Sequence, residues 1–149
     1  MNQQAQPLRI AIFDDAESSL ASYREAFGKG ARNVNLHLVN DPMFPDHVAR
    51  KLGDFEPDLI IVDLVMGRSR DDGYGLLRKL QAHSRFENIP KIIRSKLIGG
   101  SDAGQAEKAR AERLPNVIAV MPKLEEKGKE VSLAEEILAT YNEFRELSK

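Results

Sequence analysis

Five short apolar runs, separated by segments with a helical pattern, constrain the fold of this chain more than any other feature. Strands that alternate with helices along a chain are typical of a parallel sheet covered by helices. The sequence therefore predicts an α/β fold with a doubly wound, five-stranded parallel sheet in a single domain over 1–149. Residues 1–7 of this domain are expected to form a flexible N-terminal segment. The predicted strands are 8–13, 34–39, 59–62, 89–93 and 117–121.

The covering helices differ in how clearly the sequence marks them. The last is the clearest, because Ser132 and Glu135 form a predicted capping box ahead of an apolar stripe. The segment from Ala103 to Leu114 is rich in alanine and charged on all sides, so we expect its helix to be the least firmly packed. The second strand alternates polar and apolar residues, which predicts a place at the sheet edge. Two further helices have inner faces at Leu20, Tyr23 and Phe27, and at Leu76, Leu77 and Leu80.

Composition excludes several classes of protein. The 149 residues carry a formal net charge of -1, which argues against a basic surface for direct nucleic-acid binding. There is no cysteine, and hence no disulfide frame and no thiolate metal site. Nowhere do 18 apolar residues run together, and the N-terminus lacks the pattern of a signal peptide. We expect a cytoplasmic protein, without a membrane segment, whose partners are other proteins.

Carboxylates follow two of the apolar runs directly. Asp14 and Asp15 come after the first run, and Asp63 comes after the third. A strand order of 2-1-3-4-5 would make these strands neighbours and gather the three acids at the carboxyl edge of the sheet, where open α/β folds bind ligands. Carboxylates about 5 Å apart repel by roughly 3 kcal/mol per pair at an effective dielectric near 20. Oxygen ligands suit a hard cation, so the acids predict a magnesium site.

These acids, together with Ser95 after the fourth run and Lys123 after the fifth, resemble the receiver domain of two-component response regulators. The resemblance covers essentially the whole chain, and the chain is similar in its organisation to single-domain chemotaxis regulators. That family has an acidic pair after the first strand, a phosphoacceptor aspartate after the third, a serine or threonine after the fourth and a lysine after the fifth. The resemblance implies a flavodoxin-like receiver fold over 1–149.

It also implies a function. Asp63 would accept a phosphoryl group from a histidine kinase or a phosphotransfer protein, while Lys123 and Ser95 contact the phosphoryl oxygens. Such a protein catalyses only its own phosphoryl transfer and dephosphorylation, so it is a signalling domain rather than an enzyme. It would signal to a downstream effector protein by a conformational change, and it could form a homodimer. The implied Mg²⁺ ligands are Asp14 (through water), Asp15, Asp63 and the Val65 carbonyl.

Several positions depart from the family pattern. Leu124 stands where receivers usually have proline, and Val120 takes the place of the aromatic switch residue. The stretch Arg68–Asp71 is similar to a short insertion beside the acceptor, and Lys96 replaces a small residue. These departures leave open a pseudo-receiver, which would use the same fold as a phosphorylation-independent binding module. A magnesium-dependent phosphohydrolase would need a second acid two residues after the nucleophile, where this chain has Val65.

Each site residue, taken singly, has a simpler interpretation. Asp14 and Asp15 can cap the first helix, which is a common use of aspartate. Asp63 can be a solvated loop acid, Ser95 a polar strand end and Lys123 a surface lysine. All of them together, in order and each at a strand end, favour the phosphoacceptor site.

Overall fold

The computed structural model describes residues 6–28, 33–40, 48–65, 72–123 and 130–148. Five parallel strands form one sheet in the order β2-β1-β3-β4-β5. The predicted fold class and strand order are therefore confirmed. The strands are β1 (Leu8–Phe13), β2 (Val34–Val39), β3 (Leu59–Val62), β4 (Lys91–Ser95) and β5 (Val117–Pro122).

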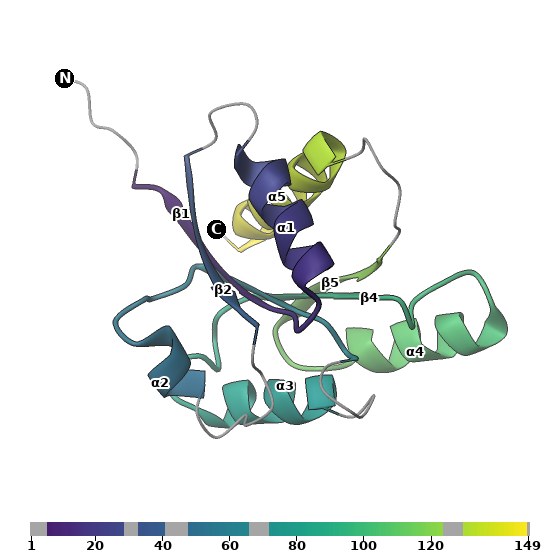
Figure 1. The fold of residues 1–149 in the computed structure, drawn as a ribbon. Coiled ribbons are helices and arrows are strands. Elements are labelled where there is room, and N and C mark those ends of the chain that lie inside the picture. Colours follow the sequence, from purple (N-terminus) through teal and green to yellow (C-terminus); the bar gives the residue numbers. More distant parts are fainter. Residues whose placement is uncertain (1–5, 29–32, 41–47, 66–71, 124–129, 149) are drawn as a thin grey trace.

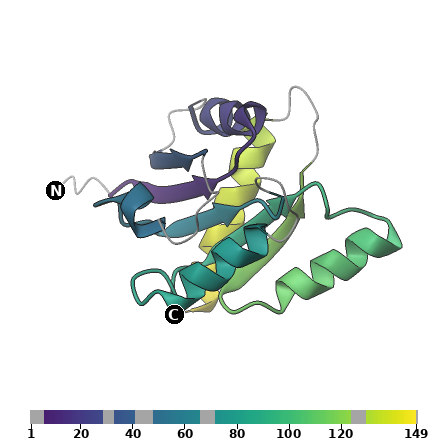
Figure 2. The same ribbon diagram turned by 60° about the horizontal axis from the view of Figure 1, so that its bottom comes forward.

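Helices cover both faces of this sheet (Figure 1). One face carries α1 and α5, and the other carries α2, α3 and α4, as the rotated view also shows (Figure 2). This is the arrangement expected for parallel strands, whose crossover connections place helices on the faces. The helices are α1 (Glu17–Gly28), α2 (Val48–Leu52), α3 (Asp72–Ala82), α4 (Asp102–Glu112) and α5 (Glu130–Leu147).

Alternate strand residues enter two separate apolar layers, because successive side chains of a strand point to opposite faces. Ile12 and Ile61 belong to the layer under α1 and α5, whereas Phe13 and Val62 belong to the layer under α2, α3 and α4. The inner faces predicted for α1 and α3 are buried in these layers, which confirms them. Their buried residues include Leu20, Tyr23, Phe27, Leu76, Leu77 and Leu80.

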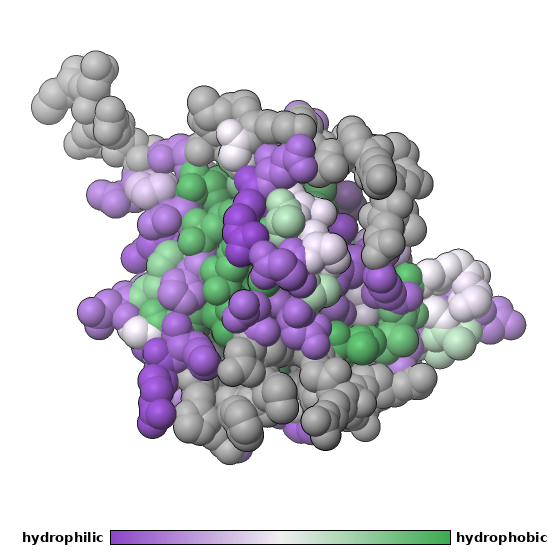
Figure 3. Space-filling model, viewed as in Figure 1, coloured by the Kyte–Doolittle hydropathy of each residue, from purple (hydrophilic) through white to green (hydrophobic). Residues whose placement is uncertain are grey.

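The edge strand and α4 also behave as the sequence predicts. β2 lies at one edge of the sheet, and Val34, Leu36 and Leu38 are only partly buried there. An apolar band is visible over this side of the molecule (Figure 3). In α4 only Gly104 and Ala111 are buried, so this helix has the smallest share in the core among the long helices.

Several predicted boundaries are wrong. The fourth strand begins at Lys91 instead of Ile89, because Pro90 has no N–H for the sheet ladder, and it ends at Ser95 instead of Ile93. The fifth strand ends at Pro122 instead of Met121. The last helix begins at Glu130, so Ser132 lies inside it and is not its N-cap. Glu130 is a good helix former, so the helix can begin before Ser132. The five-residue helix α2 was not predicted.

Some predictions concern residues that the structure does not describe. Most of the N-terminal segment predicted to be flexible, residues 1–5, lies outside the described residues. Within the described ranges, no helix is long and apolar enough to cross a membrane.

Candidate functional site

The two acids that follow β1 and β3 lie side by side at the carboxyl edge of the sheet. The strand register pairs Phe13 with Val62, and the Asp63 N–H donates to the Phe13 carbonyl at 3.1 Å. Asp14 and Asp63 therefore follow on neighbouring strands at the same level. Both side chains are buried, although carboxylates are rarely buried without a partner.

That partner is Lys123, which follows β5. Its Nζ donates to Asp14 Oδ2 at 2.6 Å and to Asp63 Oδ2 at 2.9 Å. The lysine is itself buried, so the ion pairs are screened little by water. The structure thus brings together three of the residues that the sequence predicts for the site.

Burial dominates the electrostatics of this cluster. It raises the pKa of Asp14, the hydrogen bond and charge of Lys123 oppose the rise, and the nearby charge of Asp63 adds to it. One lysine between two buried carboxylates leaves one negative charge of this trio uncompensated. The ionised form of Asp14 is therefore disfavoured in the folded protein.

Local turns hold both acids in place. The Ala16 N–H donates to Asp14 Oδ1 at 2.9 Å, and the Val65 N–H donates to Asp63 Oδ1 at 3.1 Å. An aspartate that bonds the backbone two residues ahead forms an Asx turn, a common way to begin a loop. Each carboxylate therefore uses one oxygen to order its own loop and the other to bind Lys123.

Gly73 allows helix α3 to pack against the backbone of the loop after β3, which begins with Asp63 and Leu64. Its N–H donates to the Leu64 carbonyl at 3.1 Å. A Cβ atom at this position would lie 2.4 Å from Leu64 Cα and 2.5 Å from the Asp63 carbonyl oxygen. Only glycine fits there without a shift of the backbone beside Asp63.

Ser95 and Asp15 lie next to the trio of Asp14, Asp63 and Lys123 in the chain or the sheet, but within the described residues no side-chain hydrogen bond to the trio is seen for Ser95, and Asp15 is exposed. Ser95 is fully buried, and its Oγ accepts a hydrogen bond from the Leu97 N–H at 3.2 Å. Its carbonyl accepts from the Lys123 N–H at 3.0 Å, so Ser95 is tied to the lysine through the backbone. Asp15 is exposed beside Asp14, and Val65 is 39% exposed.

Comparison with known proteins identifies the fold. No protein-family model matches the chain, and no curated protein matches it. Solved structures do match: the phosphorylated cyanobacterial phytochrome response regulator RcpA is 19% identical, with a TM-score of 0.71, 91% of this chain covered and 94% of the other. The CheY-like response regulator receiver domain protein of Methanospirillum hungatei JF-1 is 18% identical, with a TM-score of 0.64 and coverage of 94% and 98%.

This chain has the response regulator receiver fold. A further neighbour is the Mn²⁺-bound form of the response regulator Rcp1, which is 16% identical, with a TM-score of 0.67 and coverage of 88% and 91%. The neighbours confirm the resemblance at the level of the fold, including the flavodoxin-like strand order.

The donor set of this receiver-fold site suits a hard divalent cation. The carboxylate oxygens of Asp14 and Asp63 are of the kind that such ions prefer, and the trio of Asp14, Asp63 and Lys123 keeps a net negative charge. No group of three or more His, Cys, Asp or Glu side chains close enough to hold a metal occurs among the described residues. Here the ammonium of Lys123, and not a third acid, lies against the two buried carboxylates.

Sequence reasoning missed two basic residues of strand β4. Arg94 and Lys91 are both buried, although the strand is otherwise apolar up to Ser95. The sequence feature that could have indicated their burial is a charged residue within a short apolar run that lies between two other predicted strands. Such a residue needs a specific partner, because burial of an unpaired charge is costly.

The departures from the receiver pattern are partly visible. Val120 is buried, and Lys96 is exposed after Ser95. Leu124 and the Arg68–Asp71 stretch lie outside the described residues.

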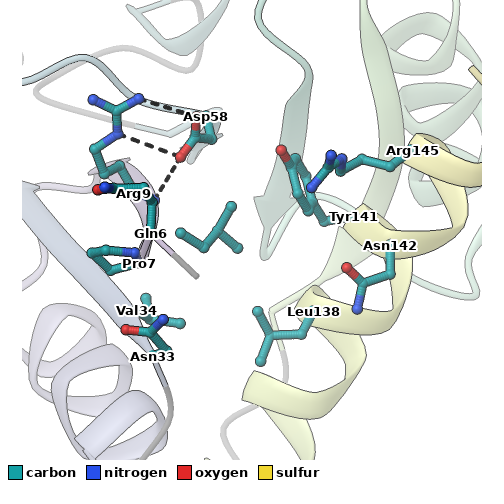
Figure 4. A pocket seen from close by; sticks show the side chains of 11 residues that line it. Gln6, Pro7, Arg9, Asn33, Val34, Asp58, Leu138, Tyr141, Asn142 and Arg145 are labelled. Atoms are coloured by element: carbon teal, nitrogen blue, oxygen red, sulfur yellow. Dashed lines mark hydrogen bonds and ion pairs between the residues drawn. The ribbon is translucent and has the colours of Figure 1, made fainter. Parts of the chain in front are cut away.

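A pocket of about 840 Å³ lies at the opposite, amino edge of the receiver fold, between the starts of β1 and β2 and the second half of α5 (Figure 4). Arg9 binds Asp58 there, with 3.3 Å between Nη2 and Oδ1, and Tyr141 and Arg145 lie across the space on α5. The pocket is remote from the trio, because it contains none of the residues at the carboxyl ends of the strands.

Proposed function

We propose that this chain works as a single response regulator receiver domain, which accepts a phosphoryl group on Asp63 from a histidine kinase or a phosphotransfer protein. The observation that carries the proposal is the pair of contacts from Lys123 Nζ to Asp63 and Asp14. A buried lysine beside a strand-end carboxylate provides a positive charge at the place where phosphoryl oxygens would arrive.

The transfer needs little covalent chemistry from the protein. An oxygen of Asp63 attacks the phosphorus atom, a new O–P bond forms, and the P–N bond of the donor phosphohistidine breaks with its electron pair going to the imidazole. Lys123 would exchange its contact with the Asp63 carboxylate for a phosphoryl oxygen. Its ammonium group on a flexible stem suits such a change of partner.

A magnesium ion would support this step by neutralising phosphoryl charge. The proposed ligands are Asp15, Asp63 and the Val65 carbonyl, with Asp14 acting through water. The uncompensated charge on the buried acids supports a cation site there. Asp14 would also keep Lys123 in place, since the two are hydrogen bonded.

Ser95 would report the modification. Its hydroxyl accepts from the Leu97 N–H, and donation from the same hydroxyl to a phosphoryl oxygen would reorient it. The loop from Ser95 to the start of α4 would then change its surface and so its affinity for an effector protein. Because α4 contributes only Gly104 and Ala111 to the core, its position is open to such a shift.

A phosphorylation-independent binding module is the second candidate. Val120 favours it, since a buried aliphatic side chain lacks the ring that switches in many receivers.

Phosphorylation by a small donor separates the two candidates. The protein is incubated with acetyl phosphate and Mg²⁺, and its intact mass is measured. We expect the parent to gain one phosphoryl group and Asp63→Asn to gain none. Asp58→Asn is the matched control, because Asp58 is an aspartate that directly precedes β3 and so lies at the opposite, amino edge of the sheet. A parent that stays unmodified, or an Asp63→Asn variant that is modified like the parent, would contradict the proposal.

A further inference from the structure

Arg94 has an unusual environment for an arginine. It lies in strand β4, is 8% exposed, and its Nη1 has no hydrogen-bond partner in the described structure. A buried donor without an acceptor is unfavourable, so native proteins rarely retain one without a reason. An anion that binds only in another state of the protein would supply the missing acceptor.

The sheet register brings Arg94 next to the acceptor. Val62 of β3 pairs with Ile93 of β4, so Asp63 and Arg94 follow as the next neighbours on the two strands. Since successive side chains alternate between faces, Arg94 lies on the same face as Ile92, which packs under α1 and α5.

The same alternation assigns the other site residues to faces. Asp63 follows Ile61 by two residues, and Lys123 follows Met121 by two; both apolar residues belong to the α1 and α5 layer. Asp63, Lys123 and Arg94 therefore share one face at the carboxyl edge. Ser95 is adjacent to Arg94 in the strand and so has the opposite orientation.

The ring of Tyr23, on α1, contacts the guanidinium of Arg94. The Cζ atom of Arg94 lies 5.2 Å from the centre of the Tyr23 ring, which is the geometry of a cation–π contact. Burial raises the pKa of Tyr23 to about 12, the charge and hydrogen bond of Arg94 oppose the rise, and the charges of Asp14 and Asp63 add to it. The charges of the arginine and of both acids therefore act on the tyrosine hydroxyl.

Before phosphorylation the acids of this wider cluster outnumber its cations: Asp14, Asp15 and Asp63 against Lys123 and Arg94. Lys123 and Arg94 are both buried, and the charges of Arg94, Asp14 and Asp63 all act on Tyr23, so these groups lie in one region. A phosphoryl group on Asp63 would replace one negative charge by nearly two, because its second pKa is about 6. The planar guanidinium is well suited to bind phosphoryl oxygens, and its Nη1 protons are unused.

We propose that Arg94 is a second phosphoryl-binding cation of the Asp63 site, with Nη1 donating to a phosphoryl oxygen and Tyr23 positioning the guanidinium. This inference rests on the proposed function, because it concerns the phosphorylated state of Asp63. Lys123 and Arg94 would hold the group from the α1 and α5 side, whereas Ser95 approaches from the other face.

Labelling kinetics provide the first test. The parent, Arg94→Gln and Arg94→Lys are incubated with limiting acetyl phosphate and Mg²⁺, and the phosphorylated fraction is followed by intact mass. A hydrogen bond to a charged group corresponds to about a 10- to 100-fold change in rate, so we expect a loss of that size in Arg94→Gln. Arg94→Lys should label faster than Arg94→Gln but more slowly than the parent, because lysine keeps the positive charge but lacks the planar pair of N–H donors of the guanidinium.

Arg85→Gln is the matched control. Arg85 also stacks on an aromatic ring, with its Cζ atom 4.9 Å from the centre of Phe86, and it also has a buried nitrogen without a hydrogen bond. It binds the carbonyls of Gly53 and Phe55 and lies far from the acceptor in the fold. We expect Arg85→Gln to lower the melting temperature and to leave the labelling rate unchanged. Equal loss of rate in the two variants would assign both arginines a structural role and overturn the inference.

A spectroscopic readout on the parent removes any dependence on the folding of a variant. The side-chain N–H signals of Arg94 are followed by NMR before and after phosphorylation. We expect them to shift and to exchange more slowly with water in the phosphorylated protein, and those of Arg85 to stay unchanged. Unmoved Arg94 signals in a labelled parent overturn this inference alone, whereas a parent that acquires no label overturns the proposed function as well.

Discussion

Two buried lysines lie at opposite edges of the same sheet and have contrasting partners. Lys91, at the start of β4, is fully buried, and its Nζ donates to the carbonyls of Phe86, Glu87 and Ile89 at 2.8, 3.1 and 2.8 Å. Lys123, after β5, donates to two carboxylates instead.

The difference separates a charge that backbone carbonyls hold from one that side-chain carboxylates hold. All three protons of Lys91 are used by backbone carbonyls, which the fold cannot withdraw without local unfolding. Burial lowers the pKa of Lys91 to about 8, because carbonyl dipoles compensate a charge less fully than water does. Lys123 binds side-chain carboxylates instead, and the charge of Asp63 would change if it is phosphorylated as proposed. Such a partner can be exchanged, which suits the proposed reversible phosphorylation.

The largest effect should come from Lys91→Met. It removes three hydrogen bonds and leaves part of their acceptors buried, so we expect a loss of about 2 to 4 kcal/mol in the free energy of unfolding. The measurement is urea denaturation at pH 7, with Lys108→Met on the exposed face of α4 as the control. Labelling of the variant while it remains folded should equal that of the parent. A variant as stable as the parent would break the distinction between the two lysines.

The same group predicts a pH dependence at the alkaline side. Since the pKa of Lys91 is lowered to about 8 in the folded protein, the unfolded chain binds more protons above that value. The contribution of Lys91 to stability should therefore increase as the pH rises from about 8 toward the ordinary lysine pKa near 10.4. Lys91→Met should lack this increase, which denaturation at pH 7 and pH 10 would measure.

Gly73→Ala should have an intermediate effect and should act at the other edge. The added Cβ would meet the backbone of Asp63 and Leu64, and overpacking of this kind costs about 1 to 3 kcal/mol. Because the displaced atoms belong to the loop after β3, labelling of Asp63 should also slow down.

Gly75→Ala is the control for this substitution. Gly75 lies in the same helix, and its Cβ would come no closer than 3.7 Å to Arg78 Nη2. We expect it to raise stability by about 0.5 to 1 kcal/mol, since alanine is the better helix former. Equal behaviour of the two alanine variants would show that α3 does not control the loop after β3.

Asp14→Asn should have the smallest effect on stability. Burial raises the pKa of Asp14, so the folded protein binds a proton more tightly than the unfolded chain and loses stability as the pH rises through the raised pKa. The asparagine does not titrate. At pH 7 the variant should therefore be slightly more stable than the parent in the absence of divalent metal, and the difference should shrink toward pH 4. A variant that is less stable at pH 7 would show that the bond to Lys123 outweighs burial.

The sequence predicts where the candidate site lies for a definite reason. Asp14, Asp63, Ser95 and Lys123 each follow an apolar run, and parallel strands bring all such positions to one edge. Local features were less reliable. The start of β4 and the capping role of Ser132 were wrong, because the first depends on a proline and the second on how far a helix continues backward.

The apolar runs by themselves predicted a parallel sheet with acids at the carboxyl ends of its strands, because these features follow from repeated local patterns. The strand order came from the general rule for open α/β folds, and the structure confirms it. Only the tertiary structure decided which charges meet. Lys123 and Asp14 are 109 residues apart in sequence, and Arg94 reaches Tyr23 across two layers of the fold. Such contacts depend on register, face and burial together, since a charged side chain in a strand takes whichever partner the packed sheet places beside it.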